Sequence, residues 1–446
     1  MLKFLTILFL AISAFAAQAS TQEFIRQYTY VAGEADSKLT ARQMALQEVK
    51  RELLSEIGTH IYSRIDISTD SSGKSDAKQE IRALTAGFVK VNIIEEKWDG
   101  YQFVIKAMLK ADPDEIVQRI KDLNKKDEKS EQLKKDLIQS NNESNLLRVQ
   151  MQELRNQLTQ AKSFKQKQKV SKQYIDKSAA LTAIDTYNQA GDYFYGRNGK
   201  YLNREKAFPL YLQAANQDHI MSQYSLGLMY QKGDGVTKNS QQAFYWFKQS
   251  AEQGYEWSQN KLGDLYKDGE GTPKDLNKAV YWLRKAAEQD HVWSQYNLAQ
   301  MYKYGKGVQK DNQQAVYWYR KAAEHNNEWA QLSLGNFYKA GKGVKKDLEQ
   351  ALYWYQKSAD QGNKFSQYYL AKMHYKGQHT QKNYDKARHF YALSAEQGYK
   401  WSQLALGNLY RQGHGVSPSQ KTARYWYEKA ASQGLAQAQK QLKSLK

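Results

Sequence analysis

The second half of the sequence is dominated by a period of 36 residues (263 − 227 = 36). A small residue recurs at this spacing as Gly191, Gly227, Gly263, Ala299, Gly335, Ala371 and Gly407. The second residue of an Ala-Ala or Ser-Ala pair keeps the same spacing from Ala215 to Ala431. A fixed period of this length predicts a solenoid, because each unit can bury its apolar face only by stacking on its neighbours.

Each period contains two amphipathic segments. In one unit, Ser258, Leu262, Leu265 and Tyr266 share one helical face, and Ala279, Trp282, Leu283, Ala286 and Ala287 share another. A short polar residue precedes every second segment and can cap its helix: Asn203, Asn239, Asp275, Asp311, Asp347, Asn383 and Ser419. Each second segment ends at Asp218, Gly254, Asp290, Asn326, Gly362, Gly398 or Gly434, and glycine and asparagine best tolerate a left-handed cap. We therefore predict seven helix-turn-helix units.

These residues resemble the Sel-1-like repeat, a branch of the tetratricopeptide superfamily. The resemblance rests on the pattern L-G-x-x-Y-x-x-G-x-G-V followed by D-x-x-x-A-x-x-W-x-x-K-A-A-x-x-G, from about Ala179 to Gly434. The first unit lacks the leucine and the paired glycines, and the sixth has Gly377-Gln378-His379 at the turn. The resemblance implies that the first helices line a concave surface on which ligands dock.

The N-terminus resembles a secretory signal. Lys3 precedes an apolar core that runs to Phe15, and Ala17-Gln18-Ala19 fits a cleavage site, although a buried first helix is the alternative. We predict a mature chain that begins near Ser20, has no transmembrane segment, and is periplasmic or secreted. Without cysteine there is neither a lipid-anchor site nor a disulfide framework. The net charge of +20 favours anionic envelope surfaces or acidic partners over nucleic acid in an exported protein, unless it serves only solubility.

Residues 20–111 have the pattern of a small α+β domain. Phe24–Val31, Phe88–Trp98 and Tyr101–Leu109 are strand-like, with a hairpin signal at Asp99-Gly100. Thr40–Ile61 carries a helical apolar stripe, Ile61–Ile67 alternates like a strand, and Thr69–Asp76 has the composition of a loop. Through "AR…AL", "TAGFV" and "WDGYQFVIKA" this domain resembles the N-terminal domain of flagellar-assembly T proteins and related envelope lipoproteins.

Residues 112–178 are rich in Lys, Glu and Gln. Heptad positions are occupied by Leu133, Leu137, Leu147, Met151, Leu154, Leu158 and Ala161, with Ser140 and Ser144 as interruptions. The pattern predicts a coiled-coil-like stalk that could form a homodimer; a partly frayed helical linker is the alternative. The expected order is signal peptide 1–19, α+β domain 20–111, stalk 112–178, seven repeats 179–433 and a C-terminal capping helix 434–446. The fold class expected is mostly α: a right-handed α-helical solenoid after a small α+β domain.

The sequence contains no specific catalytic pattern. A nucleophile elbow, a phosphate loop and an HExxH motif are all missing, and His374, His379 and His389 are too scattered for a zinc site. The paired glycines recur once per unit, which indicates turn chemistry. We predict a binding protein with no cofactor and no metal.

The candidate binding surface is a series of aromatic residues just before the small buried residue of each first helix: Trp257, Trp293, Trp329, Phe365 and Trp401. Asp264 shares the flank of the ring, and basic residues lie further round on the solvent side at Lys267, Lys303, Lys339 and Arg411, with Tyr375 breaking the series. A row of rings beside a row of cations would suit an extended acidic peptide. The alternative is that each ring packs against a neighbouring helix and only extends the interface between repeats. The other tryptophans, Trp246, Trp282, Trp318, Trp354 and Trp426, are expected in the core.

These patterns favour an exported, non-catalytic adaptor or scaffold that binds a protein segment or an acidic envelope polymer through the repeats. Two alternatives stay open. One is a structural envelope or flagellar component that acts through its α+β domain, and the other is a cell-wall-related hydrolase.

Overall fold

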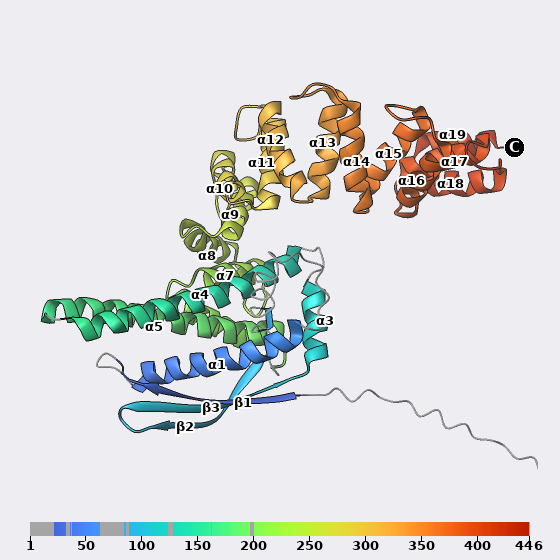
Figure 1. Cartoon of the computed structure of the whole chain (residues 1–446). Coiled ribbons are helices and arrows are strands. Elements are labelled where there is room, and N and C mark those ends of the chain that lie inside the picture. The colour runs from blue at the N-terminus through green and yellow to red at the C-terminus, as the bar shows by residue number, and fades with distance from the viewer. Residues whose placement is uncertain are drawn as a thin grey trace, which may run out of the picture. The chain divides into compact units, whose positions relative to one another are not determined.

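The computed structural model describes residues 22–32, 36, 38–62, 84–85, 89–123, 128–161, 163–196 and 200–445. The predicted signal peptide, the loop 69–76 and all but the first two residues of the strand-like segment Ile61–Ile67 lie outside these residues. The first two residues of that segment, Ile61 and Tyr62, are helical and not strand. The chain divides into two compact units, residues 1–238 and 239–446 (Figure 1).

The first unit begins with a three-stranded antiparallel sheet covered by one helix. The strands β1 (Gln22–Val31), β2 (Lys90–Trp98) and β3 (Gln102–Ala111) are ordered β1-β3-β2. Asp99 accepts hydrogen bonds from the backbone amides of Tyr101 at 2.9 Å and Gln102 at 2.6 Å, which closes the predicted hairpin between β2 and β3. The stripe of α1 (Lys38–Tyr62), with Ala41, Val49 and Ile57 fully buried, packs on the sheet, so the α+β prediction is confirmed.

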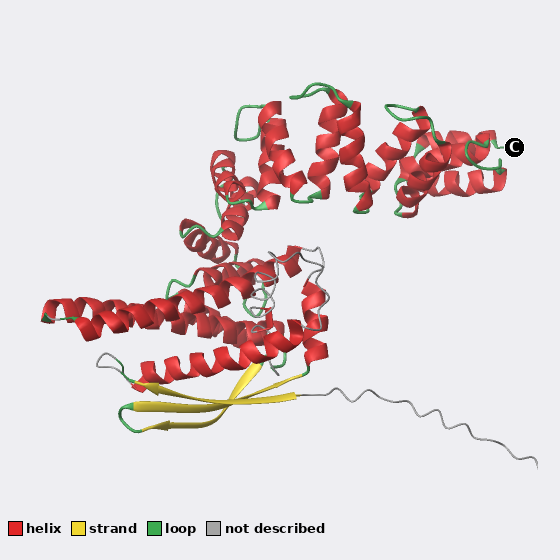
Figure 2. Ribbon diagram, viewed as in Figure 1, coloured by secondary structure: helices red, strands yellow, loops and turns green. Residues whose placement is uncertain are grey.

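The segment predicted to form a stalk folds back on itself as a helical hairpin. After α3 (Pro113–Leu123) the chain forms two long helices, α4 (Glu128–Gln160) and α5 (Phe164–Tyr195), which turn back on each other near Ser163 (Figure 2). The hydroxyl of Ser140 donates to Asn188 Oδ1 at 3.0 Å, a pairing expected of antiparallel helices that turn at that point. The heptad residues Leu137, Met151 and Leu158 are buried within the chain, so the seam that was expected to form a homodimer is already occupied.

The hairpin of α4 and α5 packs over α1 through polar side chains. Gln47 donates two hydrogen bonds to the carboxylate of Asp185, at 2.9 and 2.8 Å, and Gln43 donates to the Thr182 hydroxyl at 2.6 Å. The Tyr174 hydroxyl donates to Asp36 at 2.6 Å. The first unit is therefore layered as sheet, α1 and helical hairpin (Figure 1). Because α5 continues to Tyr195, its C-terminal half also serves as the first helix of the first repeat.

The repeats confirm the predicted hairpins. The first unit holds α6 (Arg204–Ala215) and α7 (Ile220–Lys232). The second unit holds α8 (Ser240–Glu252), α9 (Glu256–Asp268), α10 (Leu276–Glu288), α11 (Val292–Tyr304), α12 (Asn312–Glu324), α13 (Glu328–Ala340), α14 (Leu348–Asp360), α15 (Lys364–Lys376), α16 (Tyr384–Glu396), α17 (Lys400–Gln412), α18 (Gln420–Ser432) and a final helix α19 (Ala436–Ser444). All seven predicted polar residues cap second helices, and every predicted end position has a positive φ.

A row of buried glutamines joins successive hairpins. Within each first helix one glutamine donates to a backbone carbonyl eight residues earlier, for example Gln331 to Ala323 at 3.0 Å. Its own side-chain oxygen accepts from a glutamine thirty residues later, as Gln331 does from Gln361 at 2.7 Å. The same pair of bonds recurs at Gln259, Gln367 and Gln403. These bonds satisfy polar groups at the seam between repeats and fix how neighbouring hairpins stack.

Of the tryptophans expected in the core, Trp246, Trp282, Trp318 and Trp354 are buried, and Trp426 is half-buried.

Candidate protein-binding surface

The five predicted ring positions differ in exposure. Trp257 is only 2% exposed, whereas Trp401 is 36% exposed, and Trp293, Trp329 and Phe365 are half-buried. The expectation that all five rings face water is therefore wrong for Trp257.

Contact with the following repeat reduces the exposure of these rings. The ring of Trp257 meets that of His291, the N-cap residue of the next first helix, with centroids 4.6 Å apart. Phe365 likewise meets Tyr399, the N-cap residue of the next first helix α17, with ring centroids 5.1 Å apart. Each of these rings thus contributes to the stacking of repeats, and the exposed part of the ring is what remains for a ligand.

Two of the four predicted cations are engaged within the chain. Lys267 forms an ion pair with Asp264 at 2.5 Å. Arg411 donates to Gln441 and, at 3.1 Å, to the hydroxyl of Ser444, so it fastens the final helix α19. Of the four predicted cations, only Lys303 and Lys339 therefore remain as candidates for contact with a ligand.

Lys303 and Lys339 lie over aromatic rings instead. The ammonium of Lys303 is 4.8 Å from the ring centre of Tyr304, and that of Lys339 is 5.0 Å from the ring centre of Tyr369. Burial lowers the pKa of Lys339, and the positive charges of Lys372 and Lys376 lower it further. A cation that is partly buried beside two others gains most from an incoming anion.

The strongest concentration of such groups is on α13 and α15. Trp329 and Phe365 have ring centres 5.9 Å apart, and Tyr368 and Tyr369 continue along the same face of α15. The ammonium of Lys372 lies 5.7 Å from the Tyr368 ring. We call this set the aromatic–lysine patch: Trp329, Phe365, Tyr368, Tyr369, Lys339, Lys372 and Lys376.

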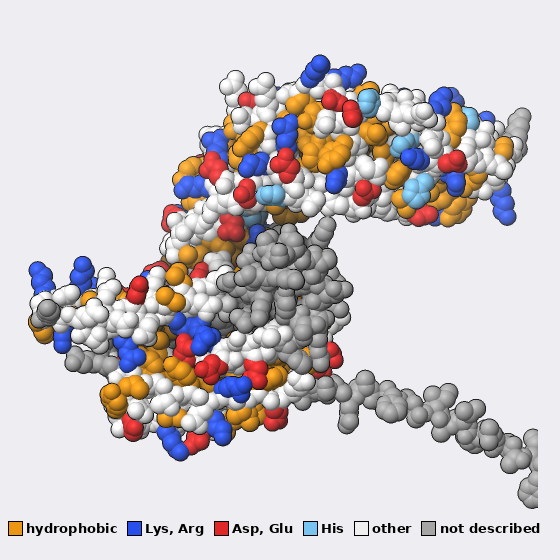
Figure 3. Space-filling model, viewed as in Figure 1, with side chains coloured by type: hydrophobic (Ala, Val, Ile, Leu, Met, Phe, Trp, Pro, Cys, Tyr) orange, Lys and Arg blue, Asp and Glu red, His pale blue; other side chains and the backbone are white. Residues whose placement is uncertain are grey.

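Within the described part of the chain, none of the three lysines of the patch forms an ion pair. Figure 3 shows one face of the repeats, on which basic, acidic and hydrophobic side chains are interspersed. The patch can therefore offer charge to an acidic ligand and ring surface to its apolar groups.

The sequence prediction missed Tyr368, Tyr369, Lys372 and Lys376. A signal was present, because the sixth repeat departs from the pattern of the others: its first helix, KFSQYYLAKMHYK, carries four basic or histidine side chains and no acid. The departure singled out in the sequence analysis concerned only the turn at Gly377-Gln378-His379. The turn itself is regular in outline, since His379 takes the positive φ of 54° that glycine adopts in other repeats.

The histidines considered as metal ligands make separate contacts. His374 is buried and stacks on Phe390, and His379 lies 3.7 Å from Glu349. Over the residues that the structure describes, no three His, Cys, Asp or Glu side chains gather as a metal site would require. In the same residues no helix is both long and apolar enough to cross a bilayer.

Stacked helical hairpins with side chains aligned along one face define this chain as a helical-repeat solenoid protein. More particularly, the chain belongs to the Sel1 repeat family. Seven successive segments match the Sel1 repeat: residues 185–219, 220–255, 258–291, 294–327, 330–363, 364–399 and 402–435.

Two solved structures resemble the chain. A protective antigen present in uropathogenic Escherichia coli strains is 34% identical, with a TM-score of 0.58, over 62% of this chain and 59% of that one. The chain thus spans about three fifths of that antigen. A Sel1 repeat protein from Oxalobacter formigenes is 28% identical, with a TM-score of 0.51, over 69% of this chain and 89% of that one. No curated protein matches the chain.

Proposed function

We propose that this protein is an exported, non-catalytic adaptor that binds an acidic protein segment on the aromatic–lysine patch. The observation that carries the proposal is the group Lys339, Lys372 and Lys376, which has no ion-pair partner among the described residues. Lys339 and Lys372 also lie over aromatic rings. Grouping like charges in this way is unfavourable unless a ligand supplies the opposite charge.

A polypeptide fits the patch better than a small ion does. The rings of Trp329 and Phe365 extend across two repeats, and the lysines of α13 and α15 flank them. An extended segment advances about 3.3 Å per residue, so about three residues cover the spacing of roughly 10 Å between stacked units. Such a segment would place carboxylates on the lysines and apolar side chains on the rings.

Family membership supports a binding role. Solenoid repeats contact only their neighbours and thereby offer extended surfaces for partners. Export rests on the sequence of residues 1–19 alone, because these residues lie outside the described structure. The location in the periplasm or outside the cell is part of the proposal.

The test uses the mature chain and two defined probes, a random copolymer of glutamate and tyrosine and the acidic polysaccharide alginate. The variant K339Q/K372Q should weaken binding of the polypeptide about tenfold, since two contacts of about 0.7 kcal/mol each are lost. The control K345Q/K346Q removes the same charge from a loop of the same repeat array and should leave affinity unchanged. Equal losses in the two variants, measured by fluorescence anisotropy, would refute the patch.

The two probes separate a protein ligand from an acidic envelope polymer. Tighter binding of alginate than of the polypeptide would favour the polymer. The alternative in which the α+β domain binds the partner needs a fragment longer than residues 20–111, because α4 and α5 cover α1. Retention of the partner by residues 20–238 and not by residues 239–446 would support that alternative.

A further inference from the structure

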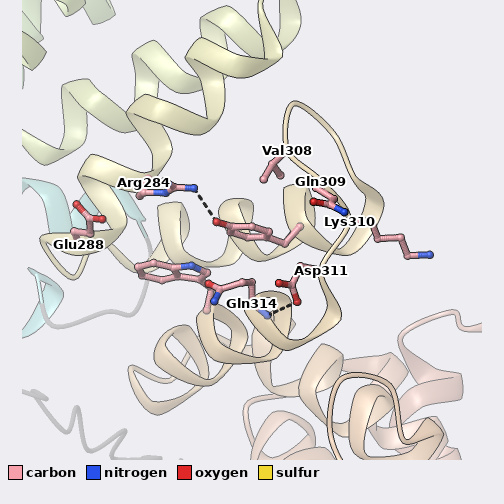
Figure 4. Close-up of a pocket in the computed structure, with 9 residues that line it drawn as sticks. Arg284, Glu288, Val308, Gln309, Lys310, Asp311 and Gln314 are labelled. Atoms are coloured by element: carbon pink, nitrogen blue, oxygen red, sulfur yellow. Dashed lines mark hydrogen bonds between the residues drawn. The ribbon is translucent and has the colours of Figure 1, made fainter.

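A pocket of about 610 Å³ is lined by residues of α10, α11 and α12 and of the turn between α11 and α12, none of which belongs to the aromatic–lysine patch. It is lined by Arg284 and Glu288 of α10, Tyr302 of α11, the turn from Val308 to Asp311, and Gln314 and Trp318 of α12 (Figure 4). None of these residues belongs to the surface predicted from the sequence.

Arg284 is positioned in the pocket by a neutral partner. Its guanidinium donates to the Tyr302 hydroxyl at 2.7 Å, as the dashed line in Figure 4 marks. Glu288 lies one turn further along α10, at the side of Arg284 away from that bond (Figure 4), and among the described residues no ion pair joins the two. The planar fork of Arg284 thus keeps donors available for an anion while a phenol holds its direction.

The second carboxylate of the pocket is already satisfied by the backbone. Asp311 caps α12 and accepts from the amides of Gln313 at 2.8 Å and Gln314 at 3.0 Å. Lys310 beside it adds a second cation to the lining. The lining thus holds two cations, Arg284 and Lys310, and two carboxylates, Glu288 and Asp311, and Arg284 is set apart because its guanidinium is bonded to a neutral hydroxyl.

The same arrangement recurs one repeat later. Arg320 donates to the Tyr338 hydroxyl at 2.8 Å, and Asp347 caps α14 by accepting from Glu349 and Gln350 amides at 2.9 Å. Trp354 stands where Trp318 does. Two arginines, each directed by a tyrosine of the next first helix, therefore stand in register on successive second helices.

We propose that the Arg284 pocket binds a peptide carboxylate. The guanidinium fork pairs with the two carboxylate oxygens, the side-chain amide of Gln314 bonds the adjoining peptide group, and Val308 and Trp318 contact a neighbouring apolar side chain. Arg320 receives a second acidic residue about three positions along the same peptide. The protein thereby has a second acidic-peptide site, built from second helices and independent of the aromatic–lysine patch.

The test follows one methyl group in the pocket by NMR. The mature chain, with labelled valine methyls and the Val308 signal assigned through V308A, is titrated with the peptide acetyl-Leu-Asp-Ala-Ala-Asp-Leu-amide. We expect saturable shifts of the Val308 signal. R284Q should weaken binding about tenfold and R284K about threefold, because lysine keeps the charge and loses the fork. Y302F should weaken it about threefold, because the guanidinium is no longer held.

The matched control is K285Q, which removes the same charge from the next residue of α10, outside the pocket lining. Its affinity should stay within about twofold of the wild type. Equal weakening by K285Q and R284Q would overturn the proposal, as would a Val308 signal that does not move. Equal binding of the same peptide with Asn in place of both Asp residues would also overturn it. Tighter binding of oligogalacturonate would assign the pocket to a carboxylate-bearing glycan instead. The K339Q/K372Q variant should leave the Val308 shifts intact, so failure of one site is distinguishable from failure of the other.

Discussion

Trp257 and Trp401 occupy the same position of two repeats, and their replacement by alanine should have unequal effects on stability. Trp257 is 2% exposed and Trp401 is 36% exposed. A tryptophan side chain can bury up to about 250 Å². The difference of 34% (36 − 2) therefore corresponds to about 85 Å², or about 2 kcal/mol at 25 cal/mol per Å².

W257A should lower the free energy of unfolding by about 3–5 kcal/mol, as expected for a large buried aromatic side chain. W401A should lower the free energy of unfolding by about 2 kcal/mol less than W257A does. The ring of Trp257 also loses its edge contact with His291, at 4.6 Å, which adds to the difference.

Urea denaturation of the mature chain, followed by circular dichroism, measures both losses. Because long repeat arrays can unfold in parts, hydrogen exchange of the amides in α9 and α17 should accompany it. The variants W257F and W401F are controls, since Phe365 stands at this position in the sixth repeat. Equal losses, or a larger loss for W401A, would refute the assignment of Trp257 to the interface between repeats.

Three further predictions concern the fold. Burial lowers the pKa of His219 from 6.5 to about 3. Below pH 6.5 the unfolded chain takes up a proton that the folded chain does not, so stability should fall by up to about 1.4 kcal/mol per pH unit between pH 6.5 and 3. In urea titrations H219N, with the asparagine cap of two other repeats, should lose this slope; an unchanged slope would assign it to other groups. At Gly307 an added Cβ would lie 2.2 Å from a backbone oxygen, so G307A should destabilise by about 2 kcal/mol or more. At the same turn position of the sixth repeat H379G should stabilise by about 1 kcal/mol, because His379 has a φ of 54°. G307A should therefore lower the thermal midpoint and H379G should raise it, and shifts in the same direction would contradict the prediction. Q47L should remove both hydrogen bonds from Gln47 Nε2 to Asp185, which keeps only its ion pair with Lys50 at 4.0 Å, and should destabilise the first unit by about 1–3 kcal/mol. Faster limited proteolysis of the α4–α5 hairpin would show this loss, and an unchanged cleavage rate would contradict it.

The local structure of the repeats was predictable because its causes are local. Caps such as Asp275 act on backbone amides three residues away, and the positive φ at Asp290 or Gly362 depends on a single residue's own sterics. The hairpin at Asp99-Gly100 and the stripe of α1 depend on short-range patterns of the same kind.

The candidate binding surface was predictable only in part, because the side chains that contact its rings and cations come partly from other repeats. Asp264 pairs with Lys267 within one helix, a contact that spacing allowed but did not require. Tyr399 meets Phe365 across a repeat boundary, and only the stacking geometry decides how much of each ring stays exposed. The Arg284 pocket has the same origin, since its partner Tyr302 belongs to the next hairpin.

The sequence by itself determined the family, the seven hairpins, their caps and turns, and the α+β character of the N-terminal domain, because periodicity and backbone preference act over a few residues. Only the tertiary structure decided that the heptads of α4 pair with α5 of the same chain. It also decided that Trp257 is buried and that Lys339 lies near two other lysines, whose charges lower its pKa. A heptad pattern specifies an apolar seam and leaves the partner open, and a repeat pattern specifies a position and leaves its exposure open. Both are settled by which surfaces meet when the chain packs.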